Sequence, residues 1–355
     1  MVIFLAPGSF QRDLQSIGVR SAVVEPGRLR HVHKGMAAVA RIRDILRQER
    51  PDLVIDWIAR AHLYGAPAAV LAGMRSRLVL WQHGLPAREA GWLRADRSLP
   101  EDPRLERAVT LLPSIAVGTP SRAAADGQQG LWPHRRAFAV LPGIEEPEPA
   151  PPAAVAVLRS SLGIPPERPV VGIVGRLQRW KAQHRLIEAL ALLRATGREL
   201  HGLIVGGDAH GLEPEYGSFL RRLVRQRRLA DAVSFTGHVP STAGYFQLMD
   251  VSVCASAKEP FGLVLLESMA VEVPVVAVDS GGPSEIVEHG RSGLLTPTND
   301  PEQLAPAIAR LIDDPALRRR LAVEGRERFR SRFTAERMTD EMQQRFVELA
   351  RGLRT

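Results

Sequence analysis

The sequence contains little cysteine, few aromatic residues and no long apolar run. Cys254 is the single cysteine among 355 residues, which excludes a disulfide framework within the chain. It lies in the apolar run 251–255, where packing in a core is favoured over reactivity as a thiol. The apolar runs end at Gly, Pro or Glu well short of the roughly 18 residues of a membrane helix, and no basic leader precedes a cleavable segment. These absences predict a cytoplasmic protein.

Acidic residues are outnumbered by basic ones, and the net charge is +8 with a pI near 10.5. The densest basic cluster consists of Arg221, Arg222, Arg225, Arg227 and Arg228. A solvated helix face explains such a cluster, and peripheral contact with an anionic membrane, at its inner face, remains an open alternative. No nucleic-acid-binding motif accompanies the charge, so nucleic acid is not an expected partner.

Short Val- and Ile-rich runs alternate with helical periods along both halves of the chain, which predicts parallel strands joined by crossover helices. No Gly-x-Gly-x-x-Gly follows a first strand, which argues against a nicotinamide dehydrogenase. The expected strands are 170–174, 202–205, 233–236, 251–255 and 275–278 in the second half, and 2–5, 22–24, 53–56, 78–81, 114–117 and 138–141 in the first.

A segment rich in Pro, Glu and Ala separates the two halves and can bury little apolar surface. We therefore expect a Rossmann-like domain at 1–141, a linker at 142–167 and a second Rossmann-like domain at 168–333. Met338, Met342, Phe346 and Leu349 have helical spacing, which predicts a C-terminal helix within 334–355.

Ligands of open parallel sheets bind beyond the carboxyl ends of the strands, so the loops there are the first place to look for a site. The loop after 170–174 reads Gly-Arg-Leu-Gln-Arg-Trp-Lys, from Gly175 to Lys181. Arg176 could bind a diphosphate as a planar fork and Lys181 as a point charge. A solvated basic loop explains the same residues equally well.

The loop after 251–255 leads from Glu259 through Pro-Phe-Gly-Leu to Glu267. Pro260 suits the first turn of a helix, which would leave the amides of Gly262 and Leu263 near its positive end, where a phosphate can bind. Glu267 lies one turn beyond Leu263 and could accept two hydrogen bonds from a ribose diol, and Glu259 could bind sugar hydroxyls. A charged helix start with one buried acid remains the alternative.

A third loop, 280–285, reads Ser-Gly-Gly-Pro-Ser-Glu and again offers backbone amides to an anion. These three loops, in this order and spacing, resemble the group 1 retaining glycosyltransferases of GT-B fold, over about residues 169–333. The resemblance implies two Rossmann-like domains facing across a cleft, with the segment 334–355 crossing back to the first domain.

The resemblance also implies roles for individual residues. Arg176, Lys181, Gly262 and Leu263 would bind the donor diphosphate, Glu267 the ribose, and Glu259 the donor sugar as a catalytic residue. His238 and Val239 would contact the nucleotide base. In the first half, Gln-His-Gly at 82–84 looks like the family's His-Gly at a strand end, which would place His83 near the reacting sugar as a second catalytic residue. A surface histidine at a strand end is the alternative.

The family pattern normally begins with a strand and a glycine-rich turn, whereas this sequence opens at what looks like the second strand. Two explanations are open: the true start of the domain lies upstream, or the chain lacks part of its acceptor site.

No Asp-x-Asp pair occurs, so the usual carboxylate clamp for a metal-bound sugar nucleotide is missing, and we expect neither a metal nor another cofactor. The resemblance implies retaining transfer of a hexose from a UDP- or GDP-sugar to a glycan, lipid-linked or small-molecule acceptor. The leading alternative is a catalytically weak or inactive sugar-nucleotide-binding protein that supports polysaccharide assembly. The sequence leaves the base, the sugar, the acceptor, the linkage and the oligomeric state open.

Overall fold

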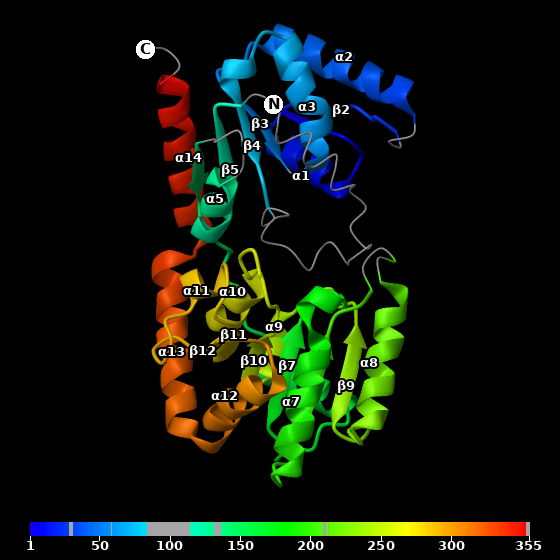
Figure 1. The fold of residues 1–355 in the computed structure, drawn as a ribbon, viewed down its shortest axis with the longest axis vertical. Coiled ribbons are helices and arrows are strands. Elements are labelled where there is room, and N and C mark those ends of the chain that lie inside the picture. Colours follow the sequence, from blue (N-terminus) through cyan, green and yellow to red (C-terminus); the bar gives the residue numbers. More distant parts are fainter. Residues whose placement is uncertain are drawn as a thin grey trace. The chain divides into compact units, whose positions relative to one another are not determined.

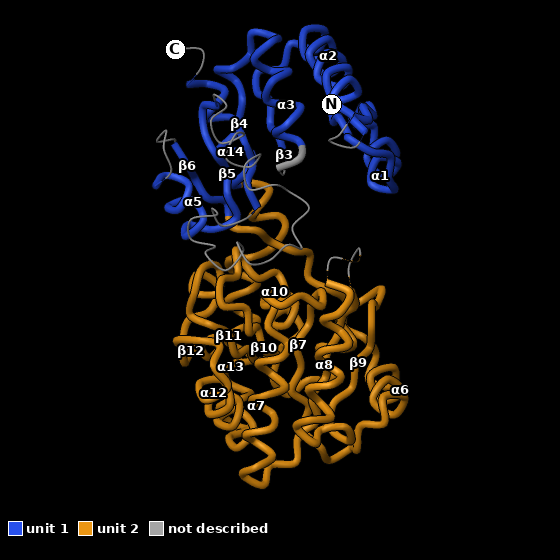
Figure 2. The backbone as a smooth tube through the Cα atoms, turned by 45° about the vertical axis from the view of Figure 1, so that its right-hand side comes forward, with its two compact units in different colours: residues 1–140, 341–355 blue, residues 141–340 orange. Residues whose placement is uncertain are grey.

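The protein is represented by a computed structural model that describes residues 1–27, 31–57, 59–83, 114–130, 136–208, 211 and 213–352. The chain divides into two compact units (Figure 2). Unit 1 comprises Met1–Val140 and Glu341–Thr355, and unit 2 comprises Leu141–Asp340. Helix α14 (Ala335–Arg351) therefore starts among the residues of unit 2 and ends among those of unit 1.

The described residues of unit 1 form two parallel sheets (Figure 1). One pairs β1 (Val2–Phe4) with β2 (Ser21–Val23), and the other has the strand order β3-β4-β5-β6. Its strands are β3 (Val54–Trp57), β4 (Leu78–Trp81), β5 (Ala116–Thr119) and β6 (Ala137–Ala139). The helices described in this unit, beside the end of α14, are α1 (Ser9–Ser16), α2 (Val32–Glu49), α3 (Ala59–Leu71) and α5 (Arg122–Gln129).

The main core of unit 1 lies between α2, α3 and the strands. Ala38, Ile42 and Leu46 recur every four residues along α2, so they form one buried stripe. This stripe packs with small residues of α3, including Ala66 and Ala69, which are fully buried and allow close approach of the two helices.

Unit 2 is built on a parallel sheet with the strand order β12-β11-β10-β7-β8-β9. Renumbered from its own first strand, this is the order 3-2-1-4-5-6 of a dinucleotide-binding Rossmann sheet. The strands are β7 (Val170–Val174), β8 (His201–Val205), β9 (Val233–Gly237), β10 (Val251–Cys254), β11 (Val275–Val278) and β12 (Leu294–Thr296). The strand order reverses between β7 and β10, and ligands of such sheets bind at that switch point.

Successive strand residues point to opposite faces of the unit 2 sheet, and both faces carry buried apolar residues. Helices therefore cover both faces. Residues of α7, α8 and α12 pack on one face, and residues of α9 and α10 pack on the other. The helices of this unit are α6 (Pro152–Ser161), α7 (Gln183–Ala195), α8 (Pro214–Gln226), α9 (Ala243–Gln247), α10 (Leu263–Ala270), α11 (Pro283–Ile286), α12 (Pro301–Asp313) and α13 (Pro315–Arg332).

The α/β fold with parallel sheets confirms the fold class expected from the sequence. Each predicted strand is present, with ends that shift by up to two residues, and β12 was missed because its three residues carry almost no pattern. The segment 142–167, predicted as a linker, contains α6. Cys254 is buried, as predicted, and burial raises the pKa of its thiol to about 12.

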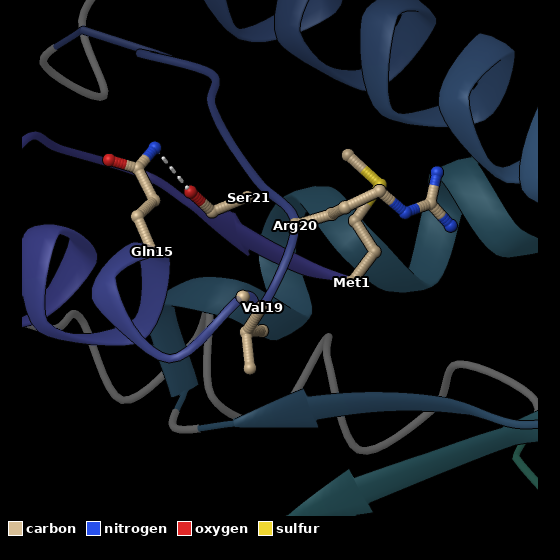
Figure 3. A pocket seen from close by; sticks show the side chains of 6 residues that line it. Met1, Gln15, Val19, Arg20 and Ser21 are labelled. Atoms are coloured by element: carbon tan, nitrogen blue, oxygen red, sulfur yellow. Dashed lines mark hydrogen bonds between the residues drawn. The ribbon is translucent and has the colours of Figure 1, made fainter.

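An open hollow of about 420 Å³ lies in unit 1 beside β1 and β2 (Figure 3). Its lining includes Met1, Gln15, Arg20 and Ser21, and the Gln15 amide donates to the Ser21 hydroxyl at 3.0 Å. Met1, Arg20 and Ser21 lie at the amino ends of β1 and β2, the edge opposite to the one where parallel sheets bind ligands. The hollow is therefore not the candidate functional site.

Candidate functional site

The loop after β7 carries the first group of predicted site residues. Gly175 has φ +151°, and its amide donates to the Val205 carbonyl at 2.9 Å. A Cβ on Gly206 would lie 2.0 Å from the Gly175 carbonyl oxygen, so the loops after β7 and β8 touch backbone to backbone. The loop then turns through a short 3₁₀ segment, Arg179–Lys181, into α7.

Within this loop, Arg176 is exposed. A hydrogen bond from a buried side chain holds its backbone carbonyl. The side-chain amide of Gln183, which is fully buried at the start of α7, donates to the Arg176 carbonyl at 2.8 Å. Sequence reasoning missed Gln183, since a polar residue at a helix start carries no signal of burial.

Lys181 and Glu259 form an ion pair across the switch point. The Lys181 Nζ lies 2.7 Å from the Glu259 Oε2, and the side chains are only 16% and 7% exposed. The ammonium also lies 4.0 Å from the centre of the Trp180 ring, within the range of a cation–π contact. An ammonium has three donors, so Lys181 can keep this pair and still donate to an anion in front of the loop. The ion pair thus joins the side chain predicted to bind the diphosphate to the one predicted to bind the donor sugar.

The start of α10 forms the second part of the site. Gly262 precedes the helix with φ +106°, and no side chain in the described ranges caps this start. The first amides of a helix have no partner within it and lie at its positive end, so they can bind an anion. Leu263 is 46% exposed at this end. One prediction was wrong here: Pro260 lies in the loop before α10 and not in its first turn.

Glu267 lies one turn further along α10 and is mostly buried. Its Oε2 accepts a hydrogen bond from the Thr242 hydroxyl at 2.9 Å. Burial raises the pKa of the Glu267 carboxyl, and the Thr242 hydrogen bond acts against that rise. Thr242, directly before α9, had no motif by which it could have been found.

The glycine pair at 281–282 was predicted to offer backbone amides to an anion, but the structure gives it a packing role. The Gly282 amide donates to the Glu259 carbonyl at 2.9 Å, so it is not free for an anion. A Cβ on Gly281 would lie 2.5 Å from the Glu259 carbonyl oxygen, and one on Gly282 would lie 2.1 Å from the Phe261 Cα. The pair therefore lets the loop after β11 lie against the loop that carries Glu259.

His238 and Val239 follow β9 at the same edge of the sheet. His238 is exposed, whereas Val239 packs partly against an apolar cluster that includes Val174 and Val205 at the ends of β7 and β8. A Cβ on Gly207 would lie 3.0 Å from the His238 amide nitrogen. Both predicted base-contacting residues thus border the loops after β8 and β9.

His83 lies in unit 1, two residues after β4, and Gly84 lies outside the described residues. Its ring is exposed and meets the Trp57 ring edge-on, with 5.3 Å between the centroids. Desolvation by the surrounding protein lowers the pKa of the imidazole, which favours its neutral form.

A buried polar group that the sequence did not reveal includes Gln82, the residue before His83. The Gln82 amide donates to Nδ1 of His62 at 3.2 Å, and Nε2 of His62 donates to the Asp56 carbonyl at 3.1 Å, which ties the end of β4 to β3. The Asp56 carboxyl is buried, and its burial raises its pKa to about 8.

The structure thus brings Arg176, Lys181, Glu259, Gly262, Leu263 and Glu267 to one edge of the unit 2 sheet, at its switch point. Among the described residues, no three or more His, Cys, Asp or Glu side chains gather in a way that could hold a metal ion. The same part of the chain contains no helix long and apolar enough to cross a membrane.

Comparisons with known proteins agree with this architecture. A family model described as "Glycosyl transferases group 1" matches residues 156–328. The lipopolysaccharide core biosynthesis glycosyltransferase LpsD of Rhizobium meliloti is 30% identical, over 95% of this chain and 86% of its own length. The D-inositol 3-phosphate glycosyltransferase of Corynebacterium urealyticum is 34% identical over 79% of this chain, and the match spans 66% of that enzyme.

Solved structures match both units. Anabaena Alr3699/HepE in complex with UDP-glucose is 25% identical, with a TM-score of 0.81 over 98% of this chain and 91% of HepE. WaaG, involved in lipopolysaccharide biosynthesis, is 16% identical with a TM-score of 0.69 over 96% of this chain and 97% of WaaG, and shows the fold alone. The chain therefore belongs to the group 1 glycosyltransferases and has their GT-B fold.

Proposed function

We propose that the chain transfers a hexose from a UDP- or GDP-sugar to a glycan, lipid-linked or small-molecule acceptor, without a metal ion and with retention of the anomeric configuration. The observation that carries this proposal is the Lys181–Glu259 ion pair at the switch point of the unit 2 sheet, beside the start of α10. HepE in complex with UDP-glucose supports a UDP-sugar donor, and LpsD supports a glycan acceptor.

Positive charge and amide donors would bind the diphosphate. Arg176 and Lys181 lie in the loop after β7, and the amides of Gly262 and Leu263 lie at the positive end of α10. Together they would stabilise the negative charge that develops on the leaving diphosphate, the task that a divalent cation performs in other enzymes.

Two carboxylates would bind the sugar and the ribose of the donor. Glu259, held by Lys181 on one oxygen, has a second oxygen with which to accept hydrogen bonds from sugar hydroxyls. Glu267 would accept from the ribose diol, with Thr242 holding one of its oxygens. His238 and Val239 would contact the base.

The chemistry would take place on one face of the sugar. The bond between the anomeric carbon and the diphosphate oxygen breaks, and the acceptor oxygen bonds to that carbon from the same face. The acceptor's proton passes to an oxygen of the departing phosphate, so no protein nucleophile is required. His83 would lie near the reacting sugar as a neutral imidazole.

We place the enzyme in the cytoplasm with peripheral contact to the inner face of an anionic membrane. The five arginines between 221 and 228 support this contact, since all of them are exposed on or directly after α8. Co-sedimentation with vesicles containing anionic lipid tests it, and an equal amount of sedimented protein with neutral vesicles would contradict it.

Turnover in the presence of a chelator tests the reaction. With UDP-glucose or GDP-mannose as donor, we expect release of nucleoside diphosphate and, by NMR, a first sugar product with the anomeric configuration of the donor. Glu259→Gln should lower turnover about 100-fold. An inverted product, or a strict need for a divalent metal, would contradict the proposal. Tight binding without turnover would favour the alternative of a sugar-nucleotide-binding protein.

A further inference from the structure

Trp57 and Trp81 form an aromatic stack at the carboxyl edge of the β3-β4-β5-β6 sheet of unit 1. The two residues end β3 and β4 and are partners in the parallel ladder. Their rings are stacked with an interplanar angle of 3° and 4.8 Å between the centroids. This edge is where parallel sheets of α/β proteins bind ligands.

Trp81 is the fixed, inner member of the stack. It is 2% exposed, and a Cβ on Gly118 of the neighbouring strand β5 would lie 2.3 Å from its ring. Phe138 and Phe346 meet the ring edge-on, at centroid distances of 6.0 and 6.2 Å. Trp81 therefore has a single well-packed position.

Trp57 is the outer member. Trp81 covers one of its faces and His83 touches it edge-on, yet 43% of Trp57 is exposed. The exposed surface belongs to the parts of the residue that Trp81 does not cover. A large apolar ring held flat on a rigid support loses little conformational freedom when a ligand packs on it.

We propose that the exposed face of Trp57 is a stacking platform for a pyranose ring of the acceptor, with His83 beside it as a hydrogen-bonding partner for a ring hydroxyl. The proposal rests on the proposed transfer to a sugar-containing acceptor. A pyranose carries C–H groups on its faces and hydroxyls around its rim. The faces pack on an aromatic ring, and the rim requires a polar neighbour such as an imidazole.

The platform differs from the donor site in chemistry and in location. The donor site of unit 2 offers cations, carboxylates and helix-start amides, which suit a diphosphate and a ribose. The Trp57 stack offers apolar area and the imidazole of His83, and therefore suits an uncharged ring. Because every pyranose has C–H faces, the platform does not require one particular epimer.

NMR of isotope-labelled tryptophan indoles in the full chain tests the proposal. The sequence has five tryptophans, and their indole N–H signals are assigned with single Trp→Phe variants. The probes are methyl α-D-glucopyranoside and methyl α-D-mannopyranoside, followed separately by UDP-glucose and GDP-mannose. Trp180, beside Lys181, reports on the donor site, and Trp57 reports on the platform.

We expect a saturable shift of the Trp57 signal with at least one glycoside, at about millimolar concentration. The Trp180 signal should not shift with the glycosides. His83→Ala should weaken that binding several-fold, and Phe10→Ala, which removes an exposed aromatic ring elsewhere in unit 1, should leave it unchanged. A Trp57 signal unmoved by both glycosides would overturn the platform, while a Trp180 shift with a nucleotide sugar would leave the donor site standing. A Trp57 shift with no response of Trp180 to either nucleotide sugar would support the platform and count against the donor site.

Discussion

Lys181 and Glu259 are 78 residues apart in the sequence, and their ion pair links the loops after β7 and β10. Both side chains are largely buried, and each compensates the charge of the other. Removing one member of a buried pair leaves an uncompensated charge, which costs more than removing the pair itself.

We therefore predict that Lys181→Met lowers the free energy of unfolding by about 2 to 4 kcal/mol in urea denaturation. The double variant Lys181→Met/Glu259→Gln should recover part of that loss, because the uncompensated carboxylate is gone. Arg194→Met, which breaks the more exposed pair with Asp231, is the matched control and should change stability little. A double variant less stable than Lys181→Met would contradict the coupling.

Glu267 gives a prediction with a definite sign in pH. Burial raises the pKa of its carboxyl above the unfolded value, so the folded state favours the protonated form. The stability contributed by that proton is complete below an unfolded pKa of about 4.3 and is lost as the pH rises through the folded pKa. Donor binding should change in the opposite direction, since a carboxylate accepts more hydrogen bonds from a ribose diol than a carboxylic acid does.

Titration with UDP-glucose between about pH 5 and about pH 8 measures this effect, because burial raises the pKa of Glu267 above its ordinary value of about 4.3. We expect affinity to fall as the pH is lowered. Glu267→Gln should bind about tenfold more weakly at high pH and with less dependence on pH. Identical pH profiles for the two proteins would exclude Glu267 from the donor site.

At the scale of elements, glycines allow the loops after β10 and β11 to approach each other closely. Gly282 has φ −60°, which any residue adopts, so its backbone conformation does not require glycine. The requirement is steric, because a Cβ there would lie 2.1 Å from the Cα of Phe261.

We predict that Gly282→Ala forces these two loops apart, lowers the free energy of unfolding by about 1 to 3 kcal/mol and weakens nucleotide-sugar binding. Gly217→Ala is the matched control within α8, since its Cβ would find the nearest atom at an ordinary 3.5 Å and alanine favours a helix. Thermal unfolding and donor titration of both variants measure the difference. Wild-type affinity in a folded Gly282→Ala protein would show that the spacing of these loops does not matter for the donor.

At the scale of the whole molecule, the strands and the loops of the second half could be predicted because local signals define them. Valine-rich runs mark β7, β10 and β11, Pro precedes the first and the last of them, and the residues after all three carry recognisable chemistry. The family and the fold class inferred from those loops are confirmed. The roles of individual site residues stay predictions.

Contacts between distant residues could not be predicted. Nothing in the local sequence pairs Lys181 with Glu259, or places Gln183 beneath Arg176. The Trp57–Trp81 stack depends on the register of β3 against β4, and short buried strands carry no register signal of their own. Pro260 was misplaced because proline suits a loop before a helix as well as a first turn.

Isothermal titration of the wild-type protein with UDP-glucose and then GDP-mannose, in the presence of a chelator, tests the donor site most directly. We predict one saturable site for one of the two nucleotides, weakened about tenfold or more in Arg176→Ala. Arg222→Ala, which removes an exposed arginine from α8, should bind as the wild type does. A folded protein that binds neither nucleotide sugar, or an Arg176→Ala variant with wild-type affinity, would contradict a donor site at the switch point of unit 2.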